Sequence, residues 1–121
     1  MSRLTLYTLR QCSTCQDAVK WLRAHKIDFE EKAIRETPPT LVELHTMLAA
    51  HKDEVRRLFN SSGLEYRALG LAKKLPALTT DEKLGLLAGN GSLVKRPFII
   101  GAGVALVGFD TEAWAKALLK K

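Results

Sequence analysis

Apolar positions divide the chain into a β-α-β beginning and a β-β-α end. The segment LTLYTL, residues 4–9, alternates apolar and polar positions and is rich in strand-forming side chains, which indicates a strand. Residues 14–25 follow with the period of a helix, and IDFEEKAI, residues 27–34, indicates a second strand. The apolar face of the helix consists of Ala18, Val19, Leu22 and the nearby Trp21. Two strands joined through a helix predict a parallel β-α-β unit with a right-handed crossover.

The middle of the chain, from about residue 40 to residue 88, has helical periodicity and predicts an insertion between the second and third strands. Thr40 and Glu43 have the spacing of a capping box that starts a helix, and Thr79 and Glu82 repeat that spacing. Leucines follow both boxes at helical intervals. Shorter helical segments are expected at 55–59 and at 64–75, separated by SSG, the second one ended by Pro76.

The end of the chain predicts a hairpin and a last helix. RPFII, residues 96–100, and VALVGF, residues 104–109, flank GAG, which is typical of a β-hairpin with a glycine turn. Asp110 can cap a helix over 111–121, whose lysines suit its C-terminal end. The element order predicts an α/β protein with a helix-covered, mixed four-stranded sheet. We expect a single domain over residues 1–121.

The chain has two cysteines, Cys12 and Cys15, and both fall between the first strand and the first helix. Open α/β sheets place their functional sites at the carboxyl ends of strands. Ser13 and Gln16 have capping-box spacing, which predicts that the helix starts at this motif. The pKa of a thiol falls at a helix N-terminus, and one helical turn separates the two thiols. The spacing therefore suits a redox pair in which Cys12 attacks and Cys15 resolves the mixed disulfide.

Two other uses of the cysteines are weaker. Structural zinc needs four ligands, and the chain can add only His25, His45 and His51 to the cysteine pair. The gap from Cys15 to His45 is about twice the usual zinc-finger spacing, so we expect no metal site. Inert burial is the remaining alternative, because cysteine is often a small core residue. Two cysteines at a helix start, with none elsewhere, make inert burial the weaker alternative.

Composition narrows the class of protein. With 46% hydrophobic and 26% charged residues, the chain has the balance of a soluble globular protein. It shows no signal peptide and no apolar run long enough to span a bilayer, so we expect a cytoplasmic protein without a membrane partner. Close-set thiols in a reducing compartment are more often catalytic, regulatory or metal-bound than structural. The net charge is +6, but the basic residues are scattered and no aromatic residues alternate with them, so we expect no direct DNA binding.

A basic tripeptide, Lys95-Arg96-Pro97, precedes the hairpin. It is compatible with an ordinary start of an edge strand, where proline is tolerated. It is equally compatible with an anion- or thiolate-binding arginine beside a cis-proline. The residues alone leave both interpretations open.

Several blocks together resemble a known family. YTLRQCSTCQDAVKWL, SSGLEYRALGL, LVKRPF and VALVGF are similar to the arsenate reductase-like (ArsC) branch of the thioredoxin superfamily, and within it to Spx/MgsR-type proteins. The resemblance covers essentially the whole chain and implies a thioredoxin-like sheet with a helical insertion. It also implies that Cys12 is the nucleophile and that Pro97 is a cis-proline facing it. Arg96, Ser13 and Thr14 are the expected anion- or thiolate-binding residues.

The chain departs from glutaredoxin-linked arsenate reductases where those enzymes hold the oxyanion. Thr8 stands in place of their histidine, and Cys15 and Gln16 stand in place of a serine and an arginine. Asn60 falls on or near the position of their middle arginine, whereas Arg96 is kept. Their late arginine is also missing, near the Gly-Phe pair that ends the last strand. A multiply charged oxyanion would lose most of its charge-assisted partners, which argues against arsenate reduction.

The cysteine pair therefore favours a thiol-disulfide redox protein, acting as an oxidoreductase or as a redox sensor. The resemblance implies a thiol reductant such as glutathione, glutaredoxin or thioredoxin, with glutathione as a co-substrate and no bound cofactor. One alternative is an Spx-like redox-sensing regulator that binds the C-terminal domain of the RNA polymerase α-subunit. A further alternative is an arsenate reductase that depends on glutathione and glutaredoxin.

Overall fold

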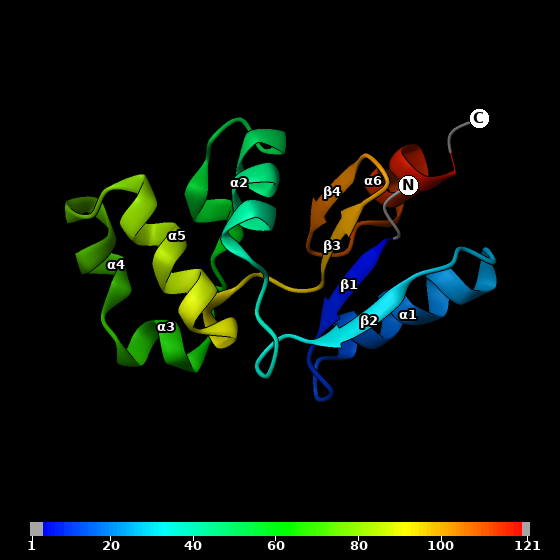
Figure 1. The fold of residues 1–121 in the computed structure, drawn as a ribbon. Coiled ribbons are helices and arrows are strands. Elements are labelled where there is room, and N and C mark those ends of the chain that lie inside the picture. Colours follow the sequence, from blue (N-terminus) through cyan, green and yellow to red (C-terminus); the bar gives the residue numbers. More distant parts are fainter. Residues whose placement is uncertain (1–3, 120–121) are drawn as a thin grey trace.

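The computed structural model describes residues 4–119, which contain a four-stranded sheet in the order β2-β1-β3-β4 (Figure 1). Its strands are β1 (Thr5–Thr8), β2 (Glu30–Ala33), β3 (Phe98–Gly101) and β4 (Val104–Val107). β1 pairs in parallel with β2 and antiparallel with β3, and β3 pairs antiparallel with β4. The predicted mixed sheet is therefore confirmed.

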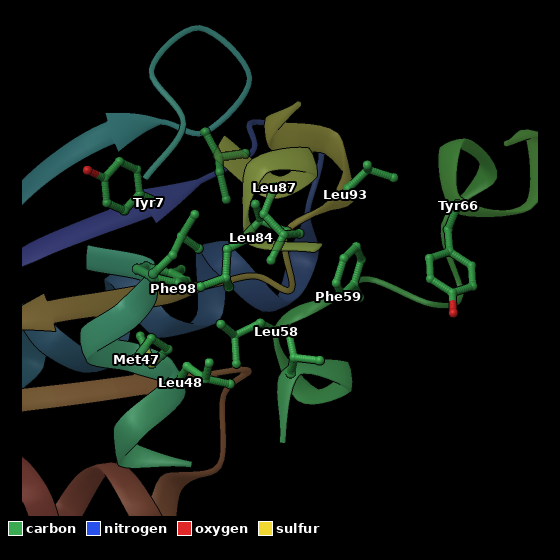
Figure 2. Packing of buried hydrophobic residues seen from close by; sticks show 14 of the residues in the cluster. Tyr7, Met47, Leu48, Leu58, Phe59, Tyr66, Leu84, Leu87, Leu93 and Phe98 are labelled. Carbon is green, nitrogen blue, oxygen red and sulfur yellow. The ribbon is translucent and has the colours of Figure 1, made fainter. Parts of the chain in front are cut away.

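Helices cover both faces of the sheet. α1 (Ser13–Ala24) and α6 (Thr111–Leu118) cover one face, where Leu6, Ile99 and Trp114 are buried (Figure 1). On the other face Tyr7 and Phe98 pack against the helical insertion, as Figure 2 shows. Neighbouring strand residues such as Leu6 and Tyr7 thus serve opposite cores, because side chains alternate along a strand.

The insertion predicted between the second and third strands is present. It consists of α2 (Leu41–Ala50), the 3-10 turn η1 (Val55–Leu58), α3 (Leu64–Ala68), α4 (Leu71–Lys74), η2 (Leu75–Ala77), α5 (Thr80–Gly89) and η3 (Gly91–Leu93). Both predicted capping boxes form in full, Thr40 with Glu43 and Thr79 with Glu82. Asp110 caps α6 through a hydrogen bond from the backbone N–H of Glu112.

Several predicted boundaries were wrong in detail, three of them for a clear structural reason. The second strand is shorter than 27–34, because the N–H of Ile27 bonds to the carbonyl of Leu22 at 3.0 Å and closes the end of α1. Pro76 lies inside η2 and does not end the helical stretch, since a first turn does not need the missing N–H. The last helix ends at Leu118, and the final two lysines of its predicted range lie outside the described residues.

One carboxylate links the insertion to the sheet. The buried Tyr7 hydroxyl donates to Glu43 Oε1 at 2.6 Å, and the same oxygen accepts the backbone N–H of Thr40 at 3.0 Å. Burial, and then the hydrogen bond to Glu43, raise the pKa of Tyr7 above its usual value. Glu43 therefore caps α2 and fixes its first turn against β1.

A second link is a close backbone contact. A Cβ at Gly91 would lie 1.8 Å from the carbonyl oxygen of Ile34, so only glycine allows η3 to approach the end of β2 this closely. The contact places Ser92 beside Arg35, whose Nε donates to Ser92 Oγ at 3.0 Å. The end of the insertion is thereby held against the segment that leads into it.

We expect Tyr7→Phe to lower the free energy of unfolding by about 1.5–3 kcal/mol, the usual contribution of a hydrogen bond to a charged group. Tyr66→Phe is the matched control, because Tyr66 is also buried and its hydroxyl has no hydrogen-bond partner among residues 4–119. It should change stability by less than about 0.5 kcal/mol. Urea unfolding of the three proteins provides the comparison, and equal losses in both variants would contradict the role of Glu43.

We expect Gly91→Ala to destabilise the fold by about 1–3 kcal/mol, because a methyl group there forces two backbone segments apart. Gly85 provides the control, since a Cβ at that position in α5 meets nothing within 4 Å. Gly85→Ala should raise stability by about 0.5–1 kcal/mol through helix propensity. Thermal unfolding should show a lower midpoint for Gly91→Ala and a higher one for Gly85→Ala. A stabilising Gly91→Ala would show that the close contact is absent.

Candidate functional site

Cys12 is the N-cap of α1. It has extended backbone angles, φ −86° and ψ 110°, and its Sγ accepts the backbone N–H of Cys15 at 3.2 Å. The helix starts at the motif as predicted, but the predicted Ser13–Gln16 capping box was wrong. Because the sulfur of Cys12 already accepts this N–H, the cap lies one residue earlier and Ser13 is the first helical residue. The Gln16 amide instead donates to the carbonyl of Arg10 at 2.9 Å.

The two thiols lie in different environments. Cys12 is half-buried, whereas Cys15 is 1% exposed on the inner face of α1. Burial raises the pKa of Cys15 to about 12, helped by the hydrogen bond to Cys12 and opposed by the Leu9 backbone and the charge of Arg96. Cys15 is therefore a neutral thiol near neutral pH. Both cysteines are free, so the pair is reduced in this structure.

A short antiparallel contact between two segments of the chain positions the loop that carries Arg96. Phe59 forms a β-bridge with Val94, and the N–H of Asn60 donates to the carbonyl of Leu93 at 2.7 Å. This crossing brings the end of the insertion next to the loop that carries Arg96.

The loop places Arg96 and Pro97 between η3 and β3. The Arg96–Pro97 peptide bond is cis, and Pro97 is buried. Arg96 Nε is buried and has no hydrogen-bond partner among the described residues, and the Arg96 charge acts on Cys15. The structure thus brings four of the predicted site residues to one end of the sheet: Cys12, Cys15, Arg96 and Pro97.

Ser13 and Thr14 are placed differently from Arg96. Both side chains are exposed in the first turn of α1. Within residues 4–119, neither forms a side-chain hydrogen bond to a cysteine or to Arg96. Their role in anion or thiolate binding stays a prediction.

A cleft next to Arg96 contains a cation that the sequence analysis missed. We call it the Arg96 cleft, and it is lined by Arg35, Asn60, Ser62, Gly63, Leu64, Glu65, Ser92 and Arg96. Arg35 follows β2, more than fifty positions away from Arg96 in the chain. No sequence signal distinguishes Arg35 from the other scattered basic residues, because only the packing of η3 against β2 brings it here.

A separate groove runs between α1 and β2. Cys15 contributes to its wall together with Lys20 and Arg23. Thr8, which stands where arsenate reductases have a histidine, donates its hydroxyl to Glu31 Oε2 in this groove at 2.7 Å. Thr8 therefore links β1 to the edge strand.

The histidines lie apart from the cysteines and from one another. His25 contacts the Trp21 ring, His45 lies 4.0 Å from Asp81, and buried His51 contacts the Met47 carbonyl. Over the described residues, no three His, Cys, Asp or Glu side chains gather in a way that could hold a metal ion.

Within residues 4–119, no helix is both long and apolar enough to cross a membrane.

We expect Cys15 to make stability fall with rising pH from about pH 9. The folded protein keeps this proton at pH values where the unfolded chain releases it, so the contribution is complete below the unfolded pKa and is lost toward the folded pKa. The free energy of unfolding should fall by up to about 1.4 kcal/mol per pH unit in this window. Cys15→Ala removes the group, so denaturant titrations should give a shallower slope for this variant than for the wild type. Equal slopes would contradict a protonated, buried Cys15.

Comparison with known proteins places this geometry in a family. The uncharacterised protein YusI of Bacillus subtilis is 39% identical over 116 residues, which cover 93% of this chain and 98% of YusI. The global transcriptional regulator Spx of Enterococcus faecalis is 30% identical over 90% of this chain and 81% of its own length. The structure of a possible arsenate reductase from Streptococcus mutans is 37% identical, with a TM-score of 0.84 over 92% of this chain and 94% of that one.

The family model agrees with these similarities. The model of the ArsC family matches residues 7–117, which include both cysteines, the whole insertion and the loop of Arg96. The thioredoxin-like fold and the Spx-type relatives that the resemblance implied are therefore confirmed. The chain belongs to the ArsC family.

Proposed function

We propose that the protein exchanges thiols and disulfides, with Cys12 as the nucleophile and Cys15 as the resolving thiol. The observation that supports this most directly is the contact between the two residues. The sulfur of Cys12 accepts a hydrogen bond from the backbone N–H of Cys15 at 3.2 Å. Hydrogen bonds to a charged acceptor are stronger than those to a neutral one, so the arrangement suits a Cys12 thiolate.

In the first step the Cys12 thiolate attacks one sulfur of a disulfide R–S–S–R′. The S–S bond of the substrate breaks, a mixed disulfide Cys12–S–S–R forms, and R′S⁻ leaves and takes up a proton from water. Half-exposure of Cys12 gives the substrate access to its sulfur. The positive charge of Arg96 acts on Cys15, and in this proposal it stabilises negative charge on sulfur during the exchange.

In the second step Cys15 loses its proton and attacks the Cys12 sulfur. The mixed disulfide breaks, R–S⁻ leaves, and a Cys12–Cys15 disulfide remains, so the substrate disulfide gains two electrons and the pair loses two. The high pKa of Cys15 makes deprotonation the demanding part of this step. A thiol reductant, such as glutathione, glutaredoxin or thioredoxin, then returns the pair to its reduced state.

Trapping tests the division of roles. We expect Cys15→Ser to accumulate a mixed disulfide at Cys12 when treated with the neutral probe 2-hydroxyethyl disulfide, whereas the wild type should go on to the internal disulfide. Cys12→Ser should form neither product at a comparable rate, because the remaining thiol is buried and protonated. Mass spectrometry of the intact proteins distinguishes the three species. Rapid reaction of Cys12→Ser would reverse the assigned roles.

A redox-sensing regulator is the second candidate function, favoured by the similarity to Spx. In this case the same Cys12–Cys15 exchange would act as a switch, and the protein would bind the C-terminal domain of the RNA polymerase α-subunit. Capture of purified α-subunit by the reduced and the oxidised protein tests this candidate. If neither the reduced nor the oxidised protein binds the α-subunit, the regulator function is disproved.

Arsenate reduction is less well supported, although one structural relative is described as a possible arsenate reductase. Asn60 provides an uncharged side chain where the reductases have an arginine, and Gln16 is turned toward the carbonyl of Arg10. We expect no arsenate turnover with glutathione and glutaredoxin, and robust turnover would show that other cations compensate.

A further inference from the structure

We propose that the Arg96 cleft binds a carboxylate of the thiol or disulfide that exchanges with Cys12, and that Arg35 is the second cation that selects it. The inference rests on the proposed function, because it names the chemical class of the molecule on which Cys12 acts. In this assignment Arg35 determines specificity for the carboxylate. Arg96 binds the carboxylate and also stabilises negative charge on sulfur.

The geometry of the cleft supports a ligand. Two guanidinium groups from distant parts of the chain line the same cleft, which Ser62, Ser92 and Asn60 also line. Neither Arg35 nor Arg96 forms a salt bridge with a carboxylate in the part of the chain that the structure describes. Two cations without acidic partners in one cleft favour the binding of an anionic ligand.

Arg35 is held in a fixed orientation. Its Nε donates to Ser92 Oγ at 3.0 Å, and Ser92 is itself fixed, because its N–H donates to Asn90 Oδ1 at 3.1 Å. The remaining N–H groups of the Arg35 guanidinium are therefore available, and the planar fork matches a carboxylate. An anchored arginine loses less side-chain freedom on binding than a free one does.

Arg96 connects the cleft to the chemistry. Its Nε is buried and has no hydrogen-bond partner among the described residues. Arg96 precedes β3, whose Phe98 pairs with Tyr7 near the end of β1, and the chain leaves β1 there toward Cys12. The Arg96 charge also acts on Cys15, whose N–H donates to Cys12 Sγ. A carboxylate bound by Arg96 would consequently lie at the same end of the sheet as the thiol pair. A short chain between that carboxylate and a sulfur atom would bring the sulfur to Cys12, which is the proximity that exchange requires.

The charge balance of the cleft favours a single carboxylate over a multiply charged oxyanion. Arg35 and Arg96 provide two positive charges, and Glu65 on the same lining provides one negative charge. The Glu65 carboxylate accepts a hydrogen bond from Asn90 Nδ2 at 3.3 Å and does not pair with either arginine. The net charge of the three ionised side chains is thus +1, which one carboxylate neutralises, whereas phosphate or arsenate would leave uncompensated negative charge.

The test compares two disulfide probes on the Cys15→Ser protein, in which Cys12 is the only thiol. One probe, 3,3′-dithiodipropionate, has carboxylates, and 2-hydroxyethyl disulfide has none. The measured quantity is the ratio of the two second-order rate constants for mixed-disulfide formation. We expect Arg35→Gln to lower this ratio about tenfold, the effect of losing one charge-assisted contact. Arg35→Lys should recover part of the ratio, and Ser92→Ala should lower it less than Arg35→Gln does.

Arg67→Gln is the matched control, because Arg67 is an exposed residue of α3 outside the cleft and its loss changes the net charge equally. It should leave the ratio unchanged. If Arg35→Gln lowers the ratio no more than Arg67→Gln does, the carboxylate site is disproved while the proposed exchange at Cys12 stands. If neither probe reacts with Cys12, the proposed function fails as well, and the inference fails with it.

Inorganic phosphate checks the charge argument. We expect it to slow the reaction of the carboxylate probe no more than sodium chloride does at equal ionic strength, because the cleft has a net charge that suits one carboxylate. Stronger inhibition by phosphate would overturn the choice of a carboxylate and indicate an oxyanion site.

Discussion

The contact between Gly91 and the backbone of Ile34 is the constraint on which the arrangement of the site depends. The insertion leaves the sheet after β2 and must return to it before β3, and Gly91 is where the returning chain touches the departing one. A side chain at this position would collide with a carbonyl group that cannot move without disturbing β2. The approach places Ser92 against Arg35, and the next residues cross Asn60 before they reach Arg96. One close backbone contact thereby sets the relative positions of Arg35, Asn60 and Arg96, which are far apart in the chain.

The two cysteines differ because one lies at the solvent-accessible start of α1 and the other on the buried face of the helix. Cys12 lies before the first turn, where its sulfur can meet solvent and accept a backbone N–H. Cys15, one turn later, faces the core beneath α1, and burial keeps its proton in place. The same spacing that brings the sulfurs together thus gives them different acidities and different access. The proposed exchange depends on this asymmetry, because the mixed disulfide would form at the outer sulfur and wait for deprotonation of the inner thiol.

The positive charge around the site is distributed differently from that of the arsenate reductases. Asn60 contributes an amide on or near the position where arsenate reductases have an arginine, and Arg96 remains beside the cis-proline. Arg35, anchored by Ser92, adds a cation from another element, and Glu65 removes one unit of charge. The cleft therefore has two cations and one carboxylate on its lining, and this balance is the basis on which we propose a single carboxylate as its ligand.

The sequence by itself determined the element order, the mixed sheet, the helical insertion and the place of the cysteine pair. These features depend on local periodicity and on caps such as Thr40–Glu43, which involve residues close together in the chain. It failed by one residue at the cap of α1, because the sulfur of Cys12 competes with the hydroxyl of Ser13 and only the backbone angles decide between them. Only the tertiary structure decided which thiol is buried and which distant arginine joins Arg96. Burial and charge pairing depend on contacts across the fold, and no local pattern in the chain records which segments will meet.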